Sequence, residues 1–262
     1  MTALMYWTIA SSDRWILAIY TDAAQVGIYA FAYSLASIGL MLNSAITLTW
    51  FPEAALAYER DRRRAPATLG RLWTRIVSAL LLTWLTVASV GGDLLRLIAA
   101  ESFHAGAVFI PWIAGGVLFF GVASLANTGL LLGKNLKPSA YWWTAGAVLS
   151  VALNLVIVRS FGALGAAVVG CACYGFIAVL VMYSSQRVLP LDIPWRRLML
   201  ISIFVVCCGC VLSVQTFGVP VQSMLIKALI VAAVSTIVVF IMAPDWAQRA
   251  MRRVTTRFRS RS

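Results

Sequence analysis

Long apolar runs separated by short polar segments make up most of this chain. A helix needs about 20 mostly apolar residues to cross the hydrocarbon core of a bilayer. Runs of about that length lie near residues 1–20, 27–51, 75–98, 107–132, 139–159, 163–184, 198–215 and 223–243. The strands of a membrane barrel would instead alternate apolar and polar residues over about ten positions. The pattern therefore predicts an all-α polytopic membrane protein with about eight transmembrane helices.

Composition agrees with a membrane environment. The chain is 61% hydrophobic and 11% charged, and a soluble domain of 262 residues could not bury that much apolar surface. The formal charge is +12, but the arginines lie in blocks between apolar runs. We therefore expect the lipid bilayer, with its anionic head groups, as the partner of these arginines, and no nucleic acid.

The basic residues alternate from one connection to the next. Most of the 21 lysines and arginines lie near residues 52–74, 133–138 and 185–197 and in the C-terminal tail. The connections between these, near residues 21–26, 99–106, 160–162 and 216–222, hold none. This alternation predicts that both termini are cytoplasmic. Residues 246–262 are predicted to form a basic cytoplasmic tail that lies on anionic lipid.

A pair of charged residues, Asp13 and Arg14, interrupts the first apolar run. A charge inside a membrane span costs at least ~2.5 kcal/mol and needs a partner or a watery cavity. Adjacent side chains point about 100° apart on a helix, so we expect at least one of the two to bond a neighbouring helix. Two interpretations remain open: the pair holds helices together near the interface, or it lines a cavity.

Several uncharged polar residues inside the runs are further candidates. Tyr29 and Tyr33 lie one helical turn apart and share a face, whereas Asn43 need not share it. The two tyrosines belong either to an aromatic belt at the interface or to a surface that faces a sugar. Asn127 and Asn154 either bond a neighbouring helix or line a pocket.

Three other sets of residues are predicted to be mainly structural. Pro52 and Glu53 follow the second run, where a proline ends or kinks a helix and the acid either caps that end or closes a gate. Asp93 and Arg96 are three positions apart and can pair on one helix face. Lys227 enters the last run early enough to extend outward to the membrane surface.

No pattern of catalytic residues is present in the sequence. The five cysteines lie inside apolar runs without a nearby histidine or carboxylate, so we expect no metal site and no cofactor. The sequence lacks a nucleophile–base constellation, a phosphate-cradling glycine loop and paired catalytic carboxylates. We therefore do not expect an enzyme.

Two stretches resemble a known family. Residues 13–17 (DRWIL), followed about a dozen positions later by residues 26–29 (VGIY), resemble the seventh helix of the polysaccharide (O-antigen type) flippase family and the turn into its eighth helix. This family belongs to the multidrug/oligosaccharidyl-lipid/polysaccharide exporter superfamily. Residues 134–138 (KNLKP) and 162–167 (GALGAA) also resemble it. Arg159 stands where the family has a proline, so the kink expected there is absent.

The resemblance covers roughly residues 8–190 and implies a fold. These residues would form the C-terminal six-helix lobe of a MATE-like two-lobe transporter, with the first helix truncated. Residues 191–245 would form the two additional transmembrane helices of fourteen-helix members. The first lobe would be absent, so the chain would be either a truncated gene product or a half that needs a missing N-terminal lobe or a separate half-transporter.

The resemblance also implies a function. Such a protein in the bacterial inner membrane would export a lipid-linked oligosaccharide, the undecaprenyl-pyrophosphate-linked repeat unit of lipopolysaccharide O-antigen, by alternating access. The candidate residues for its substrate cavity would be Asp13, Arg14, Tyr29, Tyr33, Asn43, Asn127 and Asn154. Two alternatives are a multidrug-type exporter of the same fold and a non-transporting remnant.

Overall fold

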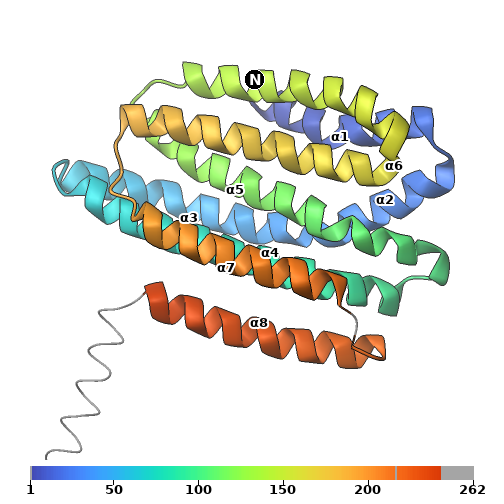
Figure 1. Cartoon of the computed structure of the whole chain (residues 1–262). Helices are drawn as coiled ribbons and strands as arrows, with labels where there is room; N and C mark the ends of the chain where they lie inside the picture. The colour runs from blue at the N-terminus through green and yellow to red at the C-terminus, as the bar shows by residue number, and fades with distance from the viewer. Residues whose placement is uncertain (1, 216, 243–262) are drawn as a thin grey trace, which may run out of the picture.

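A computed structural model describes residues 2–215 and 217–242 of the chain. In these residues it contains eight α helices, one 3-10 helix and no strand (Figure 1). The helices are α1 (Thr2–Tyr20), α2 (Ala23–Ala36), α3 (Ile38–Arg60), α4 (Ala65–Ile98), η1 (Glu101–Val108), α5 (Ile110–Leu132), α6 (Lys137–Val188), α7 (Trp195–Val214) and α8 (Pro220–Met242). The predicted all-α architecture is confirmed.

Each predicted span overlaps a helix, a pair of helices or one arm of a bent helix. Six helical stretches of the described chain are long and apolar enough to cross a membrane, with α2 and α3 joined as Ala23–Arg60. The helix α1, which carries Asp13 and Arg14, is not among the six. The helix α6 is 52 residues long and contains two of the predicted spans.

The two arms of α6 meet at Gly162. This residue has φ +55° and ψ −139°, a conformation that a residue with a side chain rarely adopts. The chain reverses direction there, and the two arms form a hairpin (Figure 1). The prediction of separate spans near residues 139–159 and 163–184 is therefore confirmed.

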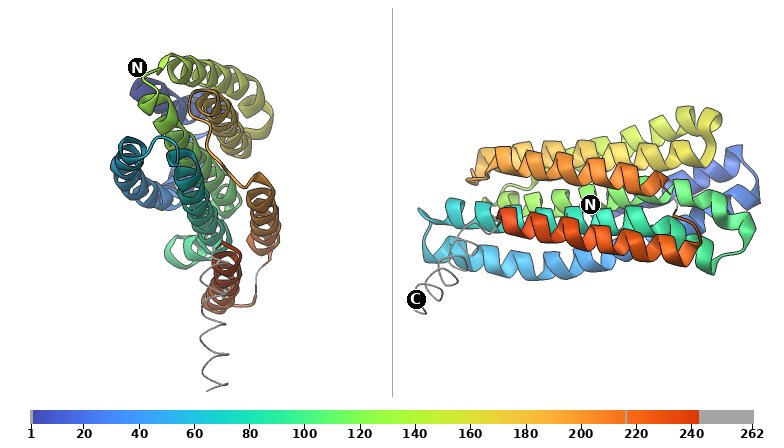
Figure 2. Two further views of the ribbon diagram at one scale, coloured as in Figure 1. Left: turned by 90° about the vertical axis from the view of Figure 1, so that its left-hand side faces the viewer. Right: turned by 60° about the horizontal axis from the view of Figure 1, so that its bottom comes forward.

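The helix α5 lies at the centre of the bundle. It packs against α2, α3, α4 and α6, and α1 packs mainly against α6 (Figures 1 and 2). The helices α7 and α8 both pack along α4 and contribute to the same apolar core. The described spans thus form one helical body with α7 and α8 attached through α4.

Close packing of α5 against α6 depends on two glycines that the sequence presents as GxxxG. A side chain at Gly129 would overlap the Ser185 hydroxyl, and one at Gly133 would overlap a methyl group of Val188. Small residues at this spacing let two helix backbones approach closely in a membrane. The two glycines therefore allow the close approach of α5 to the second arm of α6.

The helix ends separate into two groups. The turns after α3, α5 and α6 and the end of α8 lie at one end of the bundle, on the left in Figure 1. The turn after α1, the 3-10 helix η1, the bend at Gly162 and the end of α7 lie at the other end. All of the arginine-rich connections therefore share one end. The predicted basic tail, residues 246–262, lies outside the described residues.

The connection predicted near residues 52–74 is much shorter than expected. The helix α3 continues through Pro52 to Arg60, and α4 begins at Ala65. Pro52 therefore does not end the helix, because the turns around it retain their own hydrogen bonds and only the donor of the proline itself is missing. Pro52 and Glu53 are both exposed, so the structure shows no closed gate at them.

Candidate functional site

A buried carboxylate joins α1 to α2. The Asp13 side chain is 4% exposed and accepts hydrogen bonds from the Tyr29 hydroxyl at 2.5 Å and from the backbone N–H of Arg14 at 2.7 Å. Tyr29 is itself only 1% exposed. The prediction that at least one member of the Asp13–Arg14 pair bonds a neighbouring helix is confirmed.

Arg14 is held by an aromatic ring rather than by a carboxylate. Its Cζ atom lies 4.1 Å from the centroid of the Tyr33 ring, which is within the range of a cation–π interaction. The ion pairs of the described residues do not include Arg14. Its Nε atom is buried and has no hydrogen-bond partner there. The guanidinium group therefore keeps donors that a ligand could satisfy.

Tyr29 and Tyr33 share a face, as their spacing predicts. Their ring centroids are 6.3 Å apart, and the ring of Tyr29 also lies 6.0 Å from that of Phe109. Because Tyr29 is buried inside the bundle, it does not form part of a lipid-exposed aromatic belt. The two tyrosines and the Asp13–Arg14 pair form one group, which we call the Asp13 cluster.

Three residues of the Asp13 cluster, Asp13, Tyr29 and Tyr33, line a small cavity formed by α1, α2, α3, α5 and α6. The cavity has a volume of about 30 Å³, enough to hold about two water molecules. Tyr6, Asp13, Tyr29, Tyr33 and Tyr174 are among the residues that line it. The hydroxyl of Tyr174 is buried and has no hydrogen-bond partner in the described part of the chain. Tyrosines and the carboxyl group of Asp13 thus line the cavity, and Arg14 stacks on one of these tyrosines, Tyr33.

An aromatic cluster forms another wall of this cavity, and no sequence pattern indicates it. Tyr6 of α1 lies 4.7 Å, centroid to centroid, from Phe120 of α5. Phe120 in turn lies 6.0 Å from Tyr174 and 5.9 Å from Trp143, which are on the two arms of α6. These residues are far apart in the chain and lie inside apolar runs, so no local pattern distinguishes them.

The three asparagines lie away from this cavity. Asn43 of α3 donates to the backbone carbonyl of Val117 on α5 at 3.3 Å and sits against Gly121. Asn154 is completely buried and donates to Ser150 of its own helix at 3.4 Å, and the side-chain oxygen of Asn127 has no partner among the described residues. Asn43 thus joins α3 to α5, whereas Asn154, for which a bond to a neighbouring helix was one of the two interpretations, bonds within its own helix. The structure does not bring the asparagines together with the Asp13 cluster.

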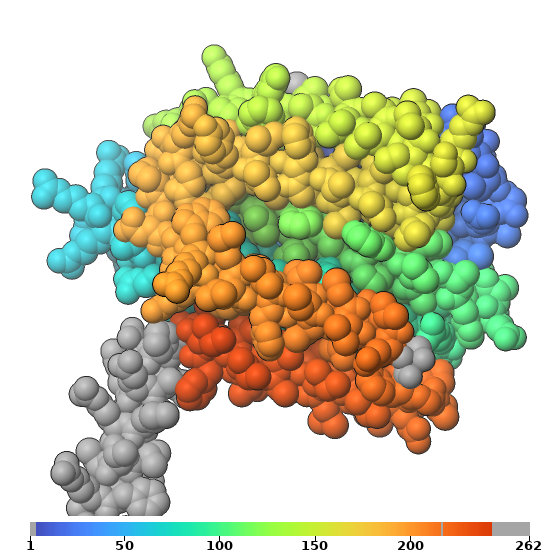
Figure 3. Space-filling model, in the orientation of Figure 1, coloured from blue at the N-terminus to red at the C-terminus, as the bar shows by residue number. Residues whose placement is uncertain are grey.

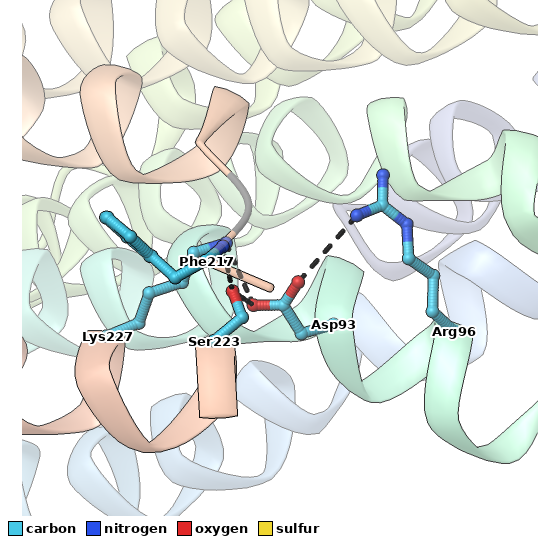
Figure 4. Close-up of polar contacts among 5 residues, drawn as sticks. All are labelled: Asp93, Arg96, Phe217, Ser223 and Lys227. Carbon is cyan, nitrogen blue, oxygen red and sulfur yellow. Dashed lines mark hydrogen bonds and ion pairs between the residues drawn. The ribbon is translucent and has the colours of Figure 1, made fainter. Parts of the chain in front are cut away.

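A second polar group lies at the end of the bundle where α4 ends (Figure 4). Lys227 of α8 places its Nζ atom 2.9 Å from Oδ2 of Asp93 on α4, and Ser223 donates to the same oxygen at 2.8 Å. Arg96 lies 3.8 Å from Oδ1 of Asp93, so the predicted pairing of Asp93 with Arg96 is confirmed.

The prediction that Lys227 extends outward is wrong. Its side chain is 3% exposed and points to α4 instead of the membrane surface (Figure 4). A lysine in an apolar helix needs either water or a counter-ion, and Asp93 supplies the counter-ion inside the bundle. The two residues are 134 positions apart in the chain, so no local sequence pattern indicates that they pair.

Comparisons with family models, with curated proteins and with solved structures find no match for this chain. The class of protein follows instead from the apolar helices and their packing. The chain is a helical membrane protein with a polar cluster buried inside its bundle.

Proposed function

We propose that this chain is one lobe of a flippase-like exporter of the bacterial inner membrane. Its substrate is a lipid-linked oligosaccharide for surface polysaccharide synthesis, which it moves outward by alternating access. One observation carries the proposal. Arg14 has a buried donor without a partner among the described residues, and it stacks on Tyr33, which lines a cavity together with Tyr6, Tyr29 and Tyr174.

The chemistry of the Asp13 cluster suits such a substrate. An arginine is always charged and offers a planar fork of donors that matches the oxygens of a pyrophosphate. Tyrosine rings stack on sugars, and their hydroxyls hydrogen-bond to them. Ionisable residues inside a membrane commonly mark the path of a substrate or ion. Asp13 then positions Tyr29, and through it the wall of the cavity, while Arg14 remains available to an anion.

A two-lobe transporter encloses its substrate between its lobes, so we propose that this lobe works with a second one. The helix α1, which carries Asp13 and Arg14, and the helix α3 present exposed apolar side chains such as Trp15, Met41 and Leu48. A second lobe would cover part of this surface, whether it belongs to the same polypeptide or to a separate half-transporter. Lipid would cover the remainder.

A multidrug-type exporter of the same fold is the second candidate, and the aromatic wall of the cavity favours it. Tyr6, Phe120 and Tyr174 present ring faces close to the carboxylate of Asp13. Ring faces and one negative charge together bind organic cations. Arg14 opposes this candidate, because its positive charge would repel such a ligand.

Deleting the coding sequence from a bacterium that carries it tests the proposal against the alternative. We expect loss of surface polysaccharide, with the lipid-linked repeat unit retained in the inner leaflet, and unchanged sensitivity to cationic drugs. Surface polysaccharide is measured on gels, and the lipid-linked repeat unit by mass spectrometry of extracted lipids. Increased drug sensitivity with normal polysaccharide would favour the multidrug exporter. Normal values of both would favour a non-transporting protein.

We also propose that the arginine-rich end of the bundle faces the cytoplasm, with both termini on that side. Reporter domains fused after Arg64, Lys137 and Arg197 should then report cytoplasm, because these positions lie at the basic end. Fusions at Ala24 and His104, at the opposite end, should report the outside. A cytoplasmic signal from either of these two positions would contradict the orientation.

A further inference from the structure

A long apolar groove runs along α7, on the side that faces α5 and the second arm of α6. Figure 3 shows this surface hollowed between α6 and α7, with α5 visible at the bottom of the hollow. Two cavities, of about 540 and 620 Å³, make up the groove and meet at Leu118 and Phe119 of α5. Each volume lies within the range of about 300–1,000 Å³ that is usual for ligand sites.

One face of α7 forms a wall of both cavities. Five of the α7 residues that line them recur every four positions, at Leu198, Ser202, Val206, Cys210 and Val214, and Trp195 and Ser213 also contribute. With 20 residues at about 1.5 Å each, α7 spans roughly 30 Å, which is about the thickness of the hydrocarbon core. Each cavity therefore occupies about half the depth of the bilayer, the depth of one leaflet.

The cavity of about 540 Å³ ends at the second polar group. Asp93, Arg96 and Lys227 are the charged residues of its lining, and their formal charges leave one positive charge in excess. Lys227 is buried against Asp93, whereas the Arg96 side chain is 36% exposed and lies 3.8 Å from the carboxylate. The excess charge is therefore accessible at Arg96, at the mouth of an apolar groove.

We propose that this cavity binds an anionic phospholipid from the adjacent leaflet. Its acyl chain fills the groove between α7 and α5, and its phosphate lies beside Arg96. Basic side chains near a membrane surface attract anionic head groups, and the apolar lining receives the chain in place of bulk lipid. The site contains neither Asp13 nor Arg14, so it goes beyond the proposed transport function and does not depend on it.

Native mass spectrometry of the purified full chain tests this site. The chain is extracted in detergent and mixed with phosphatidylglycerol or with phosphatidylcholine of the same acyl chains. We expect the anionic lipid to be retained about fivefold more than the zwitterionic one, the ratio that one accessible basic side chain gives. Arg96→Gln should reduce this ratio to about one. The matched control, Arg159→Gln, removes an exposed arginine that lines neither cavity and should leave the ratio unchanged.

Filling the groove tests where the acyl chain binds. Cys210→Trp should lower retention of both lipids several-fold, and Val206→Phe provides a second variant if the tryptophan prevents folding. Soluble glycerol phosphate should displace neither lipid. The proposal is overturned if the wild-type chain retains both lipids equally, if Arg159→Gln acts as strongly as Arg96→Gln, or if the groove-filling variants retain lipid normally. Displacement by glycerol phosphate would also overturn it, because the site would then bind a phosphate without a chain.

Discussion

Replacing Asp93 with asparagine is expected to lower the free energy of unfolding by about 3–5 kcal/mol. The change leaves the ammonium group of Lys227 buried between α4 and α8 without its counter-ion, which lies 2.9 Å away in the native chain. Lys227→Met should also be destabilising, but less so, because Ser223 and Arg96 still contact the Asp93 carboxylate. Denaturant titration of the purified chain in detergent micelles measures both effects.

The double variant separates the ion pair from ordinary packing. Combining Asp93→Asn with Lys227→Met removes both charges together, so we expect it to recover most of the lost stability. Arg64→Gln is the control: it breaks the ion pair of Arg64 with Asp61, whose side chains are both exposed, and should cost less than about 1 kcal/mol. If the single effects simply add in the double variant, the two residues do not act as a pair.

The sequence predicted the architecture because the constraints of a bilayer are local. Run length fixes which segments can span, and the alternation of basic residues matches the two groups of helix ends in the structure. The spacing of residues along one helix also correctly predicted that Asp93 pairs with Arg96 and that Tyr29 lies beside Tyr33. Each of these inferences needs only the geometry of a single helix.

Contacts between helices that are far apart in the sequence could not be predicted in this way. Nothing near Lys227 indicates that its counter-ion lies on α4, and nothing near Tyr6 indicates that it packs on Phe120. Of the two alternatives for Pro52, an end or a kink of the helix, the first is wrong for a different reason. A proline removes one hydrogen bond from a helix, and the neighbouring turns of α3 are sufficient to carry the helix on to Arg60.

The second large effect is expected at Arg14. If the proposed function holds, Arg14→Gln should reduce export of the lipid-linked oligosaccharide at least tenfold, while the amount of protein in the membrane stays normal. Glutamine keeps hydrogen-bonding capacity but loses the charge that attracts a pyrophosphate. Surface polysaccharide in a strain that carries only the variant measures export, and immunoblotting of membranes measures the amount of protein.

Substitutions at Asp13 and Tyr33 test how the neighbours of Arg14 support it, by holding its side chain in place or by supplying a charge. Asp13→Asn should lower both export and protein amount, because it weakens the bond between α1 and α2 and leaves Arg14 without a nearby negative charge. Tyr33→Phe keeps the ring beneath the guanidinium group and should export normally, whereas Tyr33→Ala removes the ring and should not. Normal polysaccharide in the Arg14→Gln strain would make this arginine an interface anchor.

The proposed function requires the Asp13 cluster to line a path that opens to water, and thiol labelling in intact membranes tests this requirement. The five native cysteines are replaced by alanine, and single cysteines are introduced at Ala10 and Tyr33, which line the cavity, and at Val158, which is buried in the apolar core. A membrane-impermeant thiol reagent should label the first two positions and leave Val158→Cys unlabelled. If Ala10→Cys and Tyr33→Cys are as unreactive as Val158→Cys, the cluster only holds helices together.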